Sequence, residues 1–361
     1  MNLLVVGLSH RTAPLTLREQ CTLSAHEVPE ALQALRRRFP LEGALVLSTC
    51  NRFECYVASA APLPAPQDLI ESLIPPYRRR PSSVEGALYA LHDREAVAHC
   101  FRVAAGLDSM IVGESEITAQ VKHAHVTAHE QKAIGPLCDR LIQKALHSAK
   151  VVRSQTGIAR GGASIGSVVS RLAAQLFGPR LAACDVLLWG AGQAAESTAR
   201  HLIKRGIHEL WIVNRTAAKA QELATLCRGG WLSWEQAVKH LGHVDIAIVC
   251  TQAPHHVLDE ADVAQILPQR RGRPLLLSDL AVPRNIDPSV KRHPGVQVHN
   301  IDDLSAIAQA GLRDRREELA RCEMLIQEQV AHFWRWWRPL SEGEEIRCPD
   351  SDPCVSASRS S

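Results

Sequence analysis

The chain has 361 residues, of which 46% are hydrophobic and 22% charged, and its formal net charge is +3. Because one hydrophobic core stops growing at roughly 250–300 residues, this length predicts two or three domains. The longest apolar runs are far shorter than the roughly 20 residues that span a bilayer, and no basic secretory leader begins the chain. We therefore expect a cytoplasmic protein. The eleven cysteines show no CxxC pair or repeated spacing, which predicts reduced thiols and no zinc site.

The first 155 residues predict an α/β domain, because apolar runs alternate with helical periodicity. Prolines mark the loops, since proline removes a backbone donor and biases its neighbours away from helix. The expected elements are strands at 3–8 and 44–47, a helix from Pro29 to Phe39 between them, loops at 60–67 and 74–83, a helical stretch from Arg94 to about Gln131 interrupted near Gly106 and Gly113, and a helix from Pro136 to about Ser154.

Residues 156–300 predict a second domain built on a parallel sheet, because short apolar runs alternate with helical stretches. The expected elements are a helix at 164–177 and strands at 186–189, 210–213, 244–250, 275–279 and 296–299.

Residues 301–340 predict a helical segment with one apolar stripe, made of Leu319, Cys322, Ile326, Val330, Phe333 and Trp337. A lone helix cannot bury such a stripe, so the helix must pack on another helix of the chain or on a second subunit. We expect this segment to support dimerisation, and we expect the polar residues 341–361 to form a disordered tail.

A dinucleotide site is predicted where the first strand of the second domain ends. The GxGxxA pattern runs through Gly190, Ala191, Gly192, Gln193, Ala194 and Ala195, directly after an apolar strand and before a helix. Glycines there permit a tight turn and let backbone amides approach a pyrophosphate. After the next strand, Asn214-Arg215-Thr216 stands where an NAD site usually carries an acidic residue, and a guanidinium there favours the 2′-phosphate of NADPH.

Cys50 follows the strand at 44–47 and lies between a hydroxyl residue and the polar pair Asn51-Arg52. A nearby cation favours the thiolate, which is the nucleophilic form of cysteine. Local sequence alone leaves two readings open, a nucleophile or a small buried hydrophobe. No base can be identified by spacing.

Taken together, the chain resembles the glutamyl-tRNA reductases over about residues 3 to 337. The fold this implies is an N-terminal α/β catalytic domain, a Rossmann-like NADPH-binding domain and a C-terminal helical dimerisation segment. The motifs that carry the resemblance are Gly7-Leu8-Ser9-His10-Arg11-Thr12-Ala13-Pro14, Ser48-Thr49-Cys50-Asn51-Arg52-Phe53-Glu54, Gly106-Leu107-Asp108-Ser109-Met110-Ile111-Val112-Gly113-Glu114, Gly190-Ala191-Gly192, Asn214-Arg215-Thr216 and Asp279 to Pro288.

The resemblance implies that Cys50 attacks the ester joining glutamate to its tRNA, and that NADPH then reduces the thioester to glutamate-1-semialdehyde, the first step of tetrapyrrole biosynthesis. It further implies tRNA(Glu) as substrate, a homodimer, and a glutamate-1-semialdehyde aminotransferase as a candidate partner. The implied site residues are Cys50 and His99 in catalysis, and Thr49, Asn51, Arg52, Ser109, Glu114, Ser115, Glu116 and Gln120 in binding the glutamyl group, with Arg52 a natural partner for its carboxylate.

The roles of His99 and of one loop, and the function itself, each leave alternatives open. His99 lies in a helical run and has a competing role as a packed histidine, and the segment from Asp279 to Pro288 either faces the nicotinamide, fixes the domain's position or is only a Pro-stiffened loop. The chain also departs from the family, with Ser115-Glu116 in place of Pro-Gln and Gln155 in place of an acidic residue. These departures make a diverged tRNA-binding or regulatory paralogue an alternative function. An NADPH oxidoreductase of shikimate dehydrogenase type is another, because it shares a cofactor domain of similar pattern and needs no cysteine nucleophile.

Overall fold

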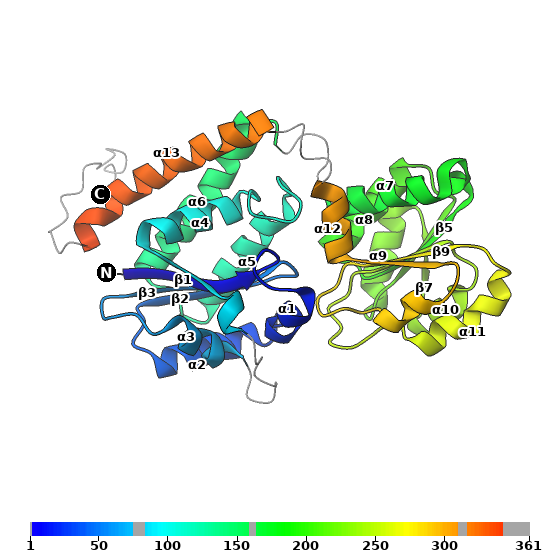
Figure 1. Cartoon of the computed structure of the whole chain (residues 1–361), viewed down its shortest axis with the longest axis horizontal. Helices are drawn as coiled ribbons and strands as arrows, with labels where there is room; N and C mark the ends of the chain where they lie inside the picture. The colour runs from blue at the N-terminus through cyan, green and yellow to red at the C-terminus, as the bar shows by residue number, and fades with distance from the viewer. Residues whose placement is uncertain (1, 75–83, 159–163, 310–315, 342–361) are drawn as a thin grey trace, which may run out of the picture.

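The computed structural model describes residues 2–74, 84–158, 164–309 and 316–341, and it contains two sheets that belong to different parts of the chain. Figure 1 shows the first part on the left, in blue to cyan, and the second on the right, in green to yellow. Among the helices described, none is both long and apolar enough to cross a membrane.

The first sheet has four antiparallel strands in the order β2-β3-β1-β4. Its strands are β1 (Asn2–Ser9), β2 (Gly43–Ser48), β3 (Arg52–Ser59) and β4 (Tyr89–His92). The two predicted strands are present, but they do not pair with each other, because the unpredicted strand β3 lies between them. Every residue of β3 is buried. The predicted order of strand, helix and strand is confirmed by β1, the helix Val28–Arg38 and β2.

Helices cover both faces of this sheet. Figure 1 shows α2 and α3 below it and α4 and α6 above it. The predicted helices are present, while α1 and α3 were not predicted, and Pro66 begins α3 instead of ending a loop, as proline commonly does in a first helical turn. The bounds are α1 (Leu15–Cys21), α2 (Val28–Arg38), α3 (Pro66–Leu73), a 3-10 turn (Glu85–Ala87), α4 (Asp93–Ala104), α5 (Glu116–Glu130) and α6 (Pro136–Gln155). Most of the predicted loop at 74–83 lies outside the described residues.

The second sheet has six parallel strands in the order β10-β9-β8-β5-β6-β7. Its strands are β5 (Asp185–Trp189), β6 (Glu209–Val213), β7 (Gly230–Leu232), β8 (Ile246–Val249), β9 (Leu275–Asp279) and β10 (Val296–Asn300). The short edge strand β7 was not predicted. Because the strand order reverses at β5, the crevice beyond its carboxyl end is where a doubly wound sheet binds its ligand.

Helices pack on both faces of the parallel sheet, so each face has its own apolar cluster. Helices α7, α8 and α9 cover one face, and α10 and α11 cover the other. Helix α7 begins with a capping box at Ser164, and Gly166 lets it approach α8 closely, because a Cβ there would lie 2.6 Å from the Thr198 Cα. The bounds are α7 (Ile165–Phe177), α8 (Gln193–Lys204), α9 (Ala217–Cys227), α10 (Trp234–His240) and α11 (Glu260–Arg270), with 3-10 turns at Gly178–Ala183 and Pro288–Arg292.

Two C-terminal helices follow, α12 (Ile301–Gln309) and α13 (Arg316–Ser341). Helix α13 returns to the first domain and lies along α4 and α6 (Figure 1). Its apolar stripe joins the core there, with the Phe333 ring meeting Phe101 edge to face and Arg140 stacked on Trp336. The sequence left open whether the stripe packs on another helix of the chain or on a second subunit, and the structure shows it on helices of the same chain. The predicted tail lies outside the described residues, apart from Ser341 at the end of α13.

Candidate active site

Cys50 lies at the tip of the hairpin that joins β2 to β3. Ser48 pairs with Phe53, and the Thr49 amide donates to the Arg52 carbonyl (2.9 Å), so Thr49 to Arg52 form the turn. The Thr49 Oγ1 accepts hydrogen bonds from the backbone amides of Asn51 (3.1 Å) and Arg52 (3.2 Å), which fixes the turn from within. A hydroxyl residue before the cysteine thus closes the loop that presents the thiol, and both neighbours of Cys50 are buried.

The Cys50 thiol is half-buried and protonated at neutral pH. Burial raises its pKa to about 12, the negative charges of Glu114 and Glu116 raise it further, and Arg18 opposes them. The nearby cation that favours the thiolate is Arg18, but burial and the two carboxylates outweigh it. The Arg52 guanidinium points instead toward carboxylates of the protein, and a base must act before Cys50 attacks an electrophile.

Arg18 is a buried residue of the site that the sequence did not reveal. Its Nη1 donates to the carbonyl of Cys50 (2.6 Å), and its Nη2 pairs with Asp302 at the start of α12. One guanidinium therefore holds both the hairpin tip and the second domain. A lone arginine in a short helix gives no local sequence signal for this role.

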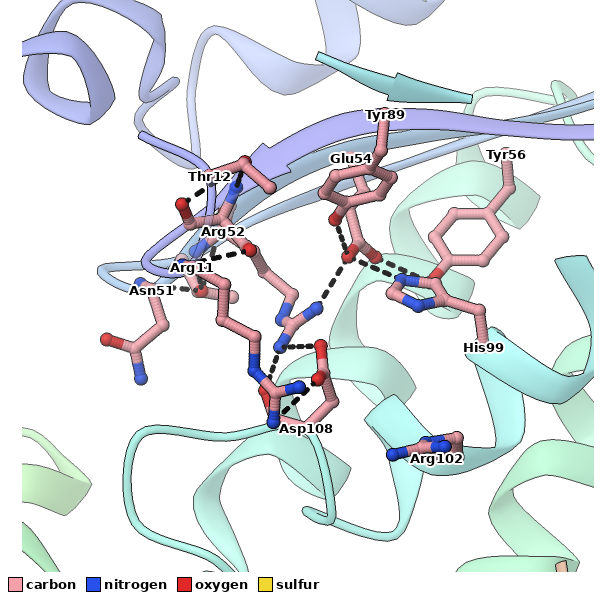
Figure 2. Close-up of polar contacts among 12 residues, drawn as sticks. Arg11, Thr12, Asn51, Arg52, Glu54, Tyr56, Tyr89, His99, Arg102 and Asp108 are labelled. Carbon is pink, nitrogen blue, oxygen red and sulfur yellow. Dashed lines mark hydrogen bonds and ion pairs between the residues drawn. The ribbon is translucent and has the colours of Figure 1, made fainter. Parts of the chain in front are cut away.

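Arg52 is fully buried and lies between two carboxylates, as Figure 2 shows. Its Nη1 is 2.6 Å from Glu54 Oε1, and its Nη2 is 3.0 Å from Asp108 Oδ2 and also donates to the Asp108 carbonyl. Arg11, which is half-exposed, reaches the other oxygen of Asp108 (3.1 Å). Arg52 thus joins β3 to the loop after α4, whereas Arg11 is the guanidinium of this group that faces solvent.

His99 belongs to the inner end of the same network. Its Nε2 lies 2.8 Å from Glu54 Oε1, and its ring packs against Tyr89 at a centroid distance of 5.4 Å. Tyr56 and Tyr89 also donate to the Glu54 carboxylate, and Arg52 and His99 hold the pKa of Glu54 well below its usual range. In Figure 2 the Arg52 side chain lies between Asn51 and His99. The structure therefore gives His99 two packed partners, Glu54 and Tyr89.

The loop before α5 brings two further carboxyl groups toward Cys50. Glu114 is buried, and its pKa is raised to about 7 by burial and by Glu116, while a hydrogen bond with Ser109 and the charge of Arg52 oppose the rise. Burial also raises the pKa of Glu116, whose buried Oε1 has no hydrogen-bond partner among the described residues. Ser115 is exposed and Gln120 half-buried. Ser109, Glu114 and Glu116 thus form one group beside the thiol.

The N-terminal motif closes this site from the other side. The His10 amide donates to the Asn51 carbonyl (2.9 Å), and the Thr12 Oγ1 accepts from the Ser9 amide (3.1 Å). Burial and the charge of Arg52 lower the pKa of His10 to about 4, so its ring is neutral, and its buried Nδ1 has no partner in the described structure. The motif was quoted from the sequence, but its residues were given no role.

The cofactor motif lies at the carboxyl edge of β5. Gly190 has φ +116°, and a Cβ there would lie 2.5 Å from the Cys250 carbonyl oxygen, so only glycine fits. A Cβ on Gly192 would meet nothing within 4 Å, so this glycine keeps space open beside the first turn of α8. Ala195 is buried, which lets α8 pack closely on the sheet. The open space and the unpaired amides of Gln193, Ala194 and Ala195 at this helix start fit a pyrophosphate.

The second part of the cofactor motif is adjacent. The Gly190 amide donates to the Val213 carbonyl (2.8 Å), which places Asn214, Arg215 and Thr216 beside the glycine turn. Asn214 Nδ2 donates to the Thr216 carbonyl (3.1 Å), and Arg215 is exposed. The structure therefore brings together all the residues predicted for the cofactor, with the exposed Arg215 beside the glycine turn.

The segment from Asp279 to Pro288 joins the two domains. The buried Asp279 carboxylate accepts from the amides of Ala281, Asn285 and Ile286, and Arg284 forms a bidentate pair with Glu19 of α1 at 2.8 and 2.9 Å. An apolar cluster also crosses this boundary. It joins Leu15, Met110 and Ile111 of the first domain to the core around α7, α8 and α12, and Cys50 packs against it. Cys50 therefore faces the second domain.

Comparisons with known proteins agree with this two-part architecture. The family model for the N-terminal domain of glutamyl-tRNA(Glu) reductase matches residues 6–156, and the model for shikimate / quinate 5-dehydrogenase matches residues 171–307. The second match covers the cofactor domain alone, as the shared cofactor fold predicts. The nucleophile hairpin lies within the first match.

Curated relatives match the chain nearly from end to end. Glutamyl-tRNA reductase of Syntrophotalea carbinolica is 38% identical over 94% of this chain and 76% of its own, and that of Moorella thermoacetica is 36% identical over 93% and 76%. The solved glutamyl-tRNA reductase of Methanopyrus kandleri is 33% identical, with a TM-score of 0.51 over 94% of this chain and 81% of its own. The chain belongs to the glutamyl-tRNA reductase family.

Proposed function

We propose that this chain reduces glutamyl-tRNA(Glu) to glutamate-1-semialdehyde with NADPH, through a thioester on Cys50. The observation that carries the proposal is the position of Cys50, on a hairpin tip fixed by Thr49 and packed against the apolar cluster shared with the cofactor domain. A thioester formed there would be close to the domain that supplies the reductant. Thiolates are both good nucleophiles and good leaving groups, and both properties are needed here.

In the first step the Cys50 Sγ attacks the ester carbonyl carbon of the glutamyl group. The S–C bond forms, the bond to the ribose oxygen breaks, and that oxygen takes up a proton as tRNA leaves. The thiol must lose its own proton first, since its pKa is about 12. Glu114, with a pKa of about 7, is the carboxylate near Cys50 whose affinity for a proton is suited to accept it.

In the second step the thioester carbon accepts a hydride, and the S–C bond breaks to give the aldehyde and the Cys50 thiolate, which then takes up a proton. The cofactor supplies that hydride when bound. The chain would hold the pyrophosphate at Gly190, Ala191, Gly192 and the start of α8, and would hold the 2′-phosphate with Arg215. Asn214 and Thr216 shape the turn that presents this guanidinium.

The glutamyl group would bind between the hairpin and the loop before α5, at Thr49, Asn51, Ser109, Glu114, Ser115, Glu116 and Gln120. The carboxylates of Glu114 and Glu116 complement its α-ammonium group, so the acidic residue at 116 suits one end of the substrate. Arg52 is already paired with Glu54 and Asp108, so we assign it to positioning the site. The exposed Arg11 is better placed to meet the substrate carboxylate.

The remaining assignments follow the same division. We propose residues 1–155 as the domain that recognises glutamyl-tRNA, 156–300 as the NADPH domain and 301–340 as a helical segment. A homodimer and a passage of the aldehyde to an aminotransferase remain proposals for the assembled enzyme. His99 would act on the site through Glu54, because its Nε2 is engaged there.

The test is to incubate the protein with tRNA carrying labelled glutamate, without NADPH. Label trapped on Cys50, with free tRNA released, supports the thioester route, and Cys50→Ser should abolish both the label and NADPH oxidation while cofactor binding persists. Cys250→Ser, on the cofactor edge, is the matched control. Intact charged tRNA with no acyl-enzyme would favour the inactive paralogue, and reduction retained in Cys50→Ser would favour a direct hydride transfer of shikimate dehydrogenase type.

A further inference from the structure

Three metal-ligand side chains meet on the outer side of the first domain, where α5 ends and α6 begins. His125 and His129 stand four residues apart on α5, so both rings lie on one face of the helix. Asp139 stands in the first turn of α6 and reaches the same point. None of these residues belongs to the group around Cys50 or to the cofactor edge.

The ligand atoms of the three residues converge closely. His125 Nε2 is 2.7 Å and His129 Nε2 is 2.8 Å from the same oxygen of Asp139, and all three ligand atoms lie within 4.8 Å of one another. The two imidazole rings are packed edge to face at a centroid distance of 4.7 Å. Ligands of a tetrahedral ion stand about 3.3 Å apart when each bond is about 2.0–2.1 Å, so small side-chain shifts would admit one.

A further contact supports the carboxylate from behind. Gln143, one turn further along α6, donates from its Nε2 to the second oxygen of Asp139 at 2.9 Å. Metal-bound carboxylates are commonly held by such a hydrogen bond, which fixes their orientation. His125 and Asp139 are half-buried, while His129 is more than half exposed, so the group is anchored on one side and open to solvent on the other.

We propose that His125, His129 and Asp139 form a binding site for a divalent transition-metal ion of the zinc class. Two neutral imidazoles and one carboxylate suit Zn²⁺, Co²⁺ or Ni²⁺, whereas Mg²⁺ and Ca²⁺ prefer oxygen ligands alone. Histidines at this helical spacing are a known zinc-binding arrangement. The exposed side leaves room for water to complete the coordination sphere.

The bound ion would join α5 to α6. Helix α5 starts at Glu116 and carries Gln120, so its first turn belongs to the group beside Cys50, and the metal would fix the opposite end of that helix. The ion would therefore stabilise the first domain without touching the reacting atoms. We expect metal binding to raise the melting temperature and to slow amide exchange at the end of α5 and the start of α6.

The experiment is a Co²⁺ titration of the full chain after treatment with a chelator, followed by visible absorption and calorimetry. We expect one ion per chain, the d–d bands of nitrogen and oxygen ligation, and displacement by Zn²⁺. His129→Ala and Asp139→Asn should each weaken binding more than tenfold, and Gln143→Leu about tenfold. His123→Ala, an exposed histidine on the same helix, is the control and should bind as the wild type does.

Two results would overturn the proposal. One is wild-type affinity in His129→Ala or Asp139→Asn. The other is a strong near-ultraviolet charge-transfer band, which would show that cysteine thiolates hold the ion. Circular dichroism of each metal-free variant separates lost binding from lost folding, and the conservative Asp139→Asn keeps the side-chain shape. A binding-competent His123→Ala alongside a folded, non-binding Asp139→Asn is the expected pattern.

Discussion

The two halves of the candidate active site are built in opposite ways. Around Cys50, buried side chains pair with one another, and Arg52, Glu54 and Asp108 leave few donors free. At the carboxyl edge of β5, by contrast, the space beside Gly192 is open and the Arg215 side chain is exposed. The charges of the first half are buried and paired, so substitutions there should change the free energy of unfolding and the pKa values of neighbouring groups. The second half should respond mainly in ligand affinity.

The largest effect is expected for Arg52→Met, which leaves Glu54 and Asp108 buried without their common cation. Breaking a buried ion pair by removing one partner costs about 3–5 kcal/mol. Urea denaturation should show a loss of this size in the free energy of unfolding. Arg11→Met is the matched control, because Arg11 pairs with the same Asp108 from a half-exposed position and should cost at most about 1 kcal/mol. Equal losses of unfolding free energy in the two variants would contradict the difference expected between a buried and a half-exposed arginine.

Glu114→Gln should change how stability depends on pH. The folded-state pKa of Glu114 is about 7, above the usual value of 4.5, so the folded state binds the proton more tightly than the unfolded state. Its contribution to stability is therefore full at low pH and is lost as pH rises from about 4.5 to 7. The difference amounts to about 3 kcal/mol. Glutamine removes this dependence.

The measurement is the free energy of unfolding of both proteins from pH 4 to 8. The stability of the variant relative to the wild type should rise across this range and level off above pH 7. Glu130→Gln, an exposed residue at the end of α5, is the control and should run parallel to the wild type. If the stability of Glu114→Gln instead runs parallel to that of the wild type, folding does not raise the pKa of this carboxyl group.

On the cofactor side, Arg215→Ser should leave stability unchanged and weaken the preference for NADPH over NADH. Charge-assisted hydrogen bonds are worth about 1.5–3 kcal/mol, so the preference should fall roughly 10- to 100-fold. Dissociation constants for both nucleotides test this directly. Arg228→Ser, at the far end of α9, should have no effect. An unchanged preference in Arg215→Ser would assign the 2′-phosphate to another group.

The smallest effect is expected for Glu116→Gln, which removes one of the two negative charges that raise the pKa of Cys50. The thiolate fraction at a given pH should rise by up to about tenfold, since one pKa unit is a factor of ten. The rate of Cys50 alkylation by iodoacetamide, followed by peptide mass spectrometry, reports this fraction. Ser115→Ala, next to it and exposed, should alkylate at the wild-type rate. A slower alkylation in Glu116→Gln would contradict the prediction that the charge of Glu116 raises the pKa of Cys50.

The cofactor half could be predicted from sequence because its signal is local. Gly190, Gly192 and Ala195 follow one strand within a few residues, and strand, turn and helix are encoded in the same short segment. The position of Cys50 at a strand end was predicted for the same reason. Strand β3 was not predicted, although Arg52 and Glu54 alternate with Phe53 and Cys55 as in a half-buried strand. The structure shows that the polar face of β3 is buried as well, because Arg52 and Glu54 pair with each other inside the domain.

The electrostatics around Cys50 could not be predicted, because they depend on residues far apart in the chain. Arg18 comes from α1, Glu114 and Glu116 come from the loop before α5, and Asp302 comes from α12. The proposed metal site is similar. Cysteine spacing indicated no zinc site, while His125, His129 and Asp139 meet only because α5 and α6 pack together.

Helix α13 gives the molecule a second connection between its domains. The chain enters the cofactor domain after α6 and comes back before α13, which then lies along α4 and α6 (Figure 1). Two domains joined by a single linker can rotate freely about it, whereas a second connection restricts that rotation. Any movement between the two domains would therefore have to satisfy both connections. Because the apolar stripe of α13 is buried against α4 and α6, a relative movement of the two domains would have to carry this helix with the first domain or break its packing.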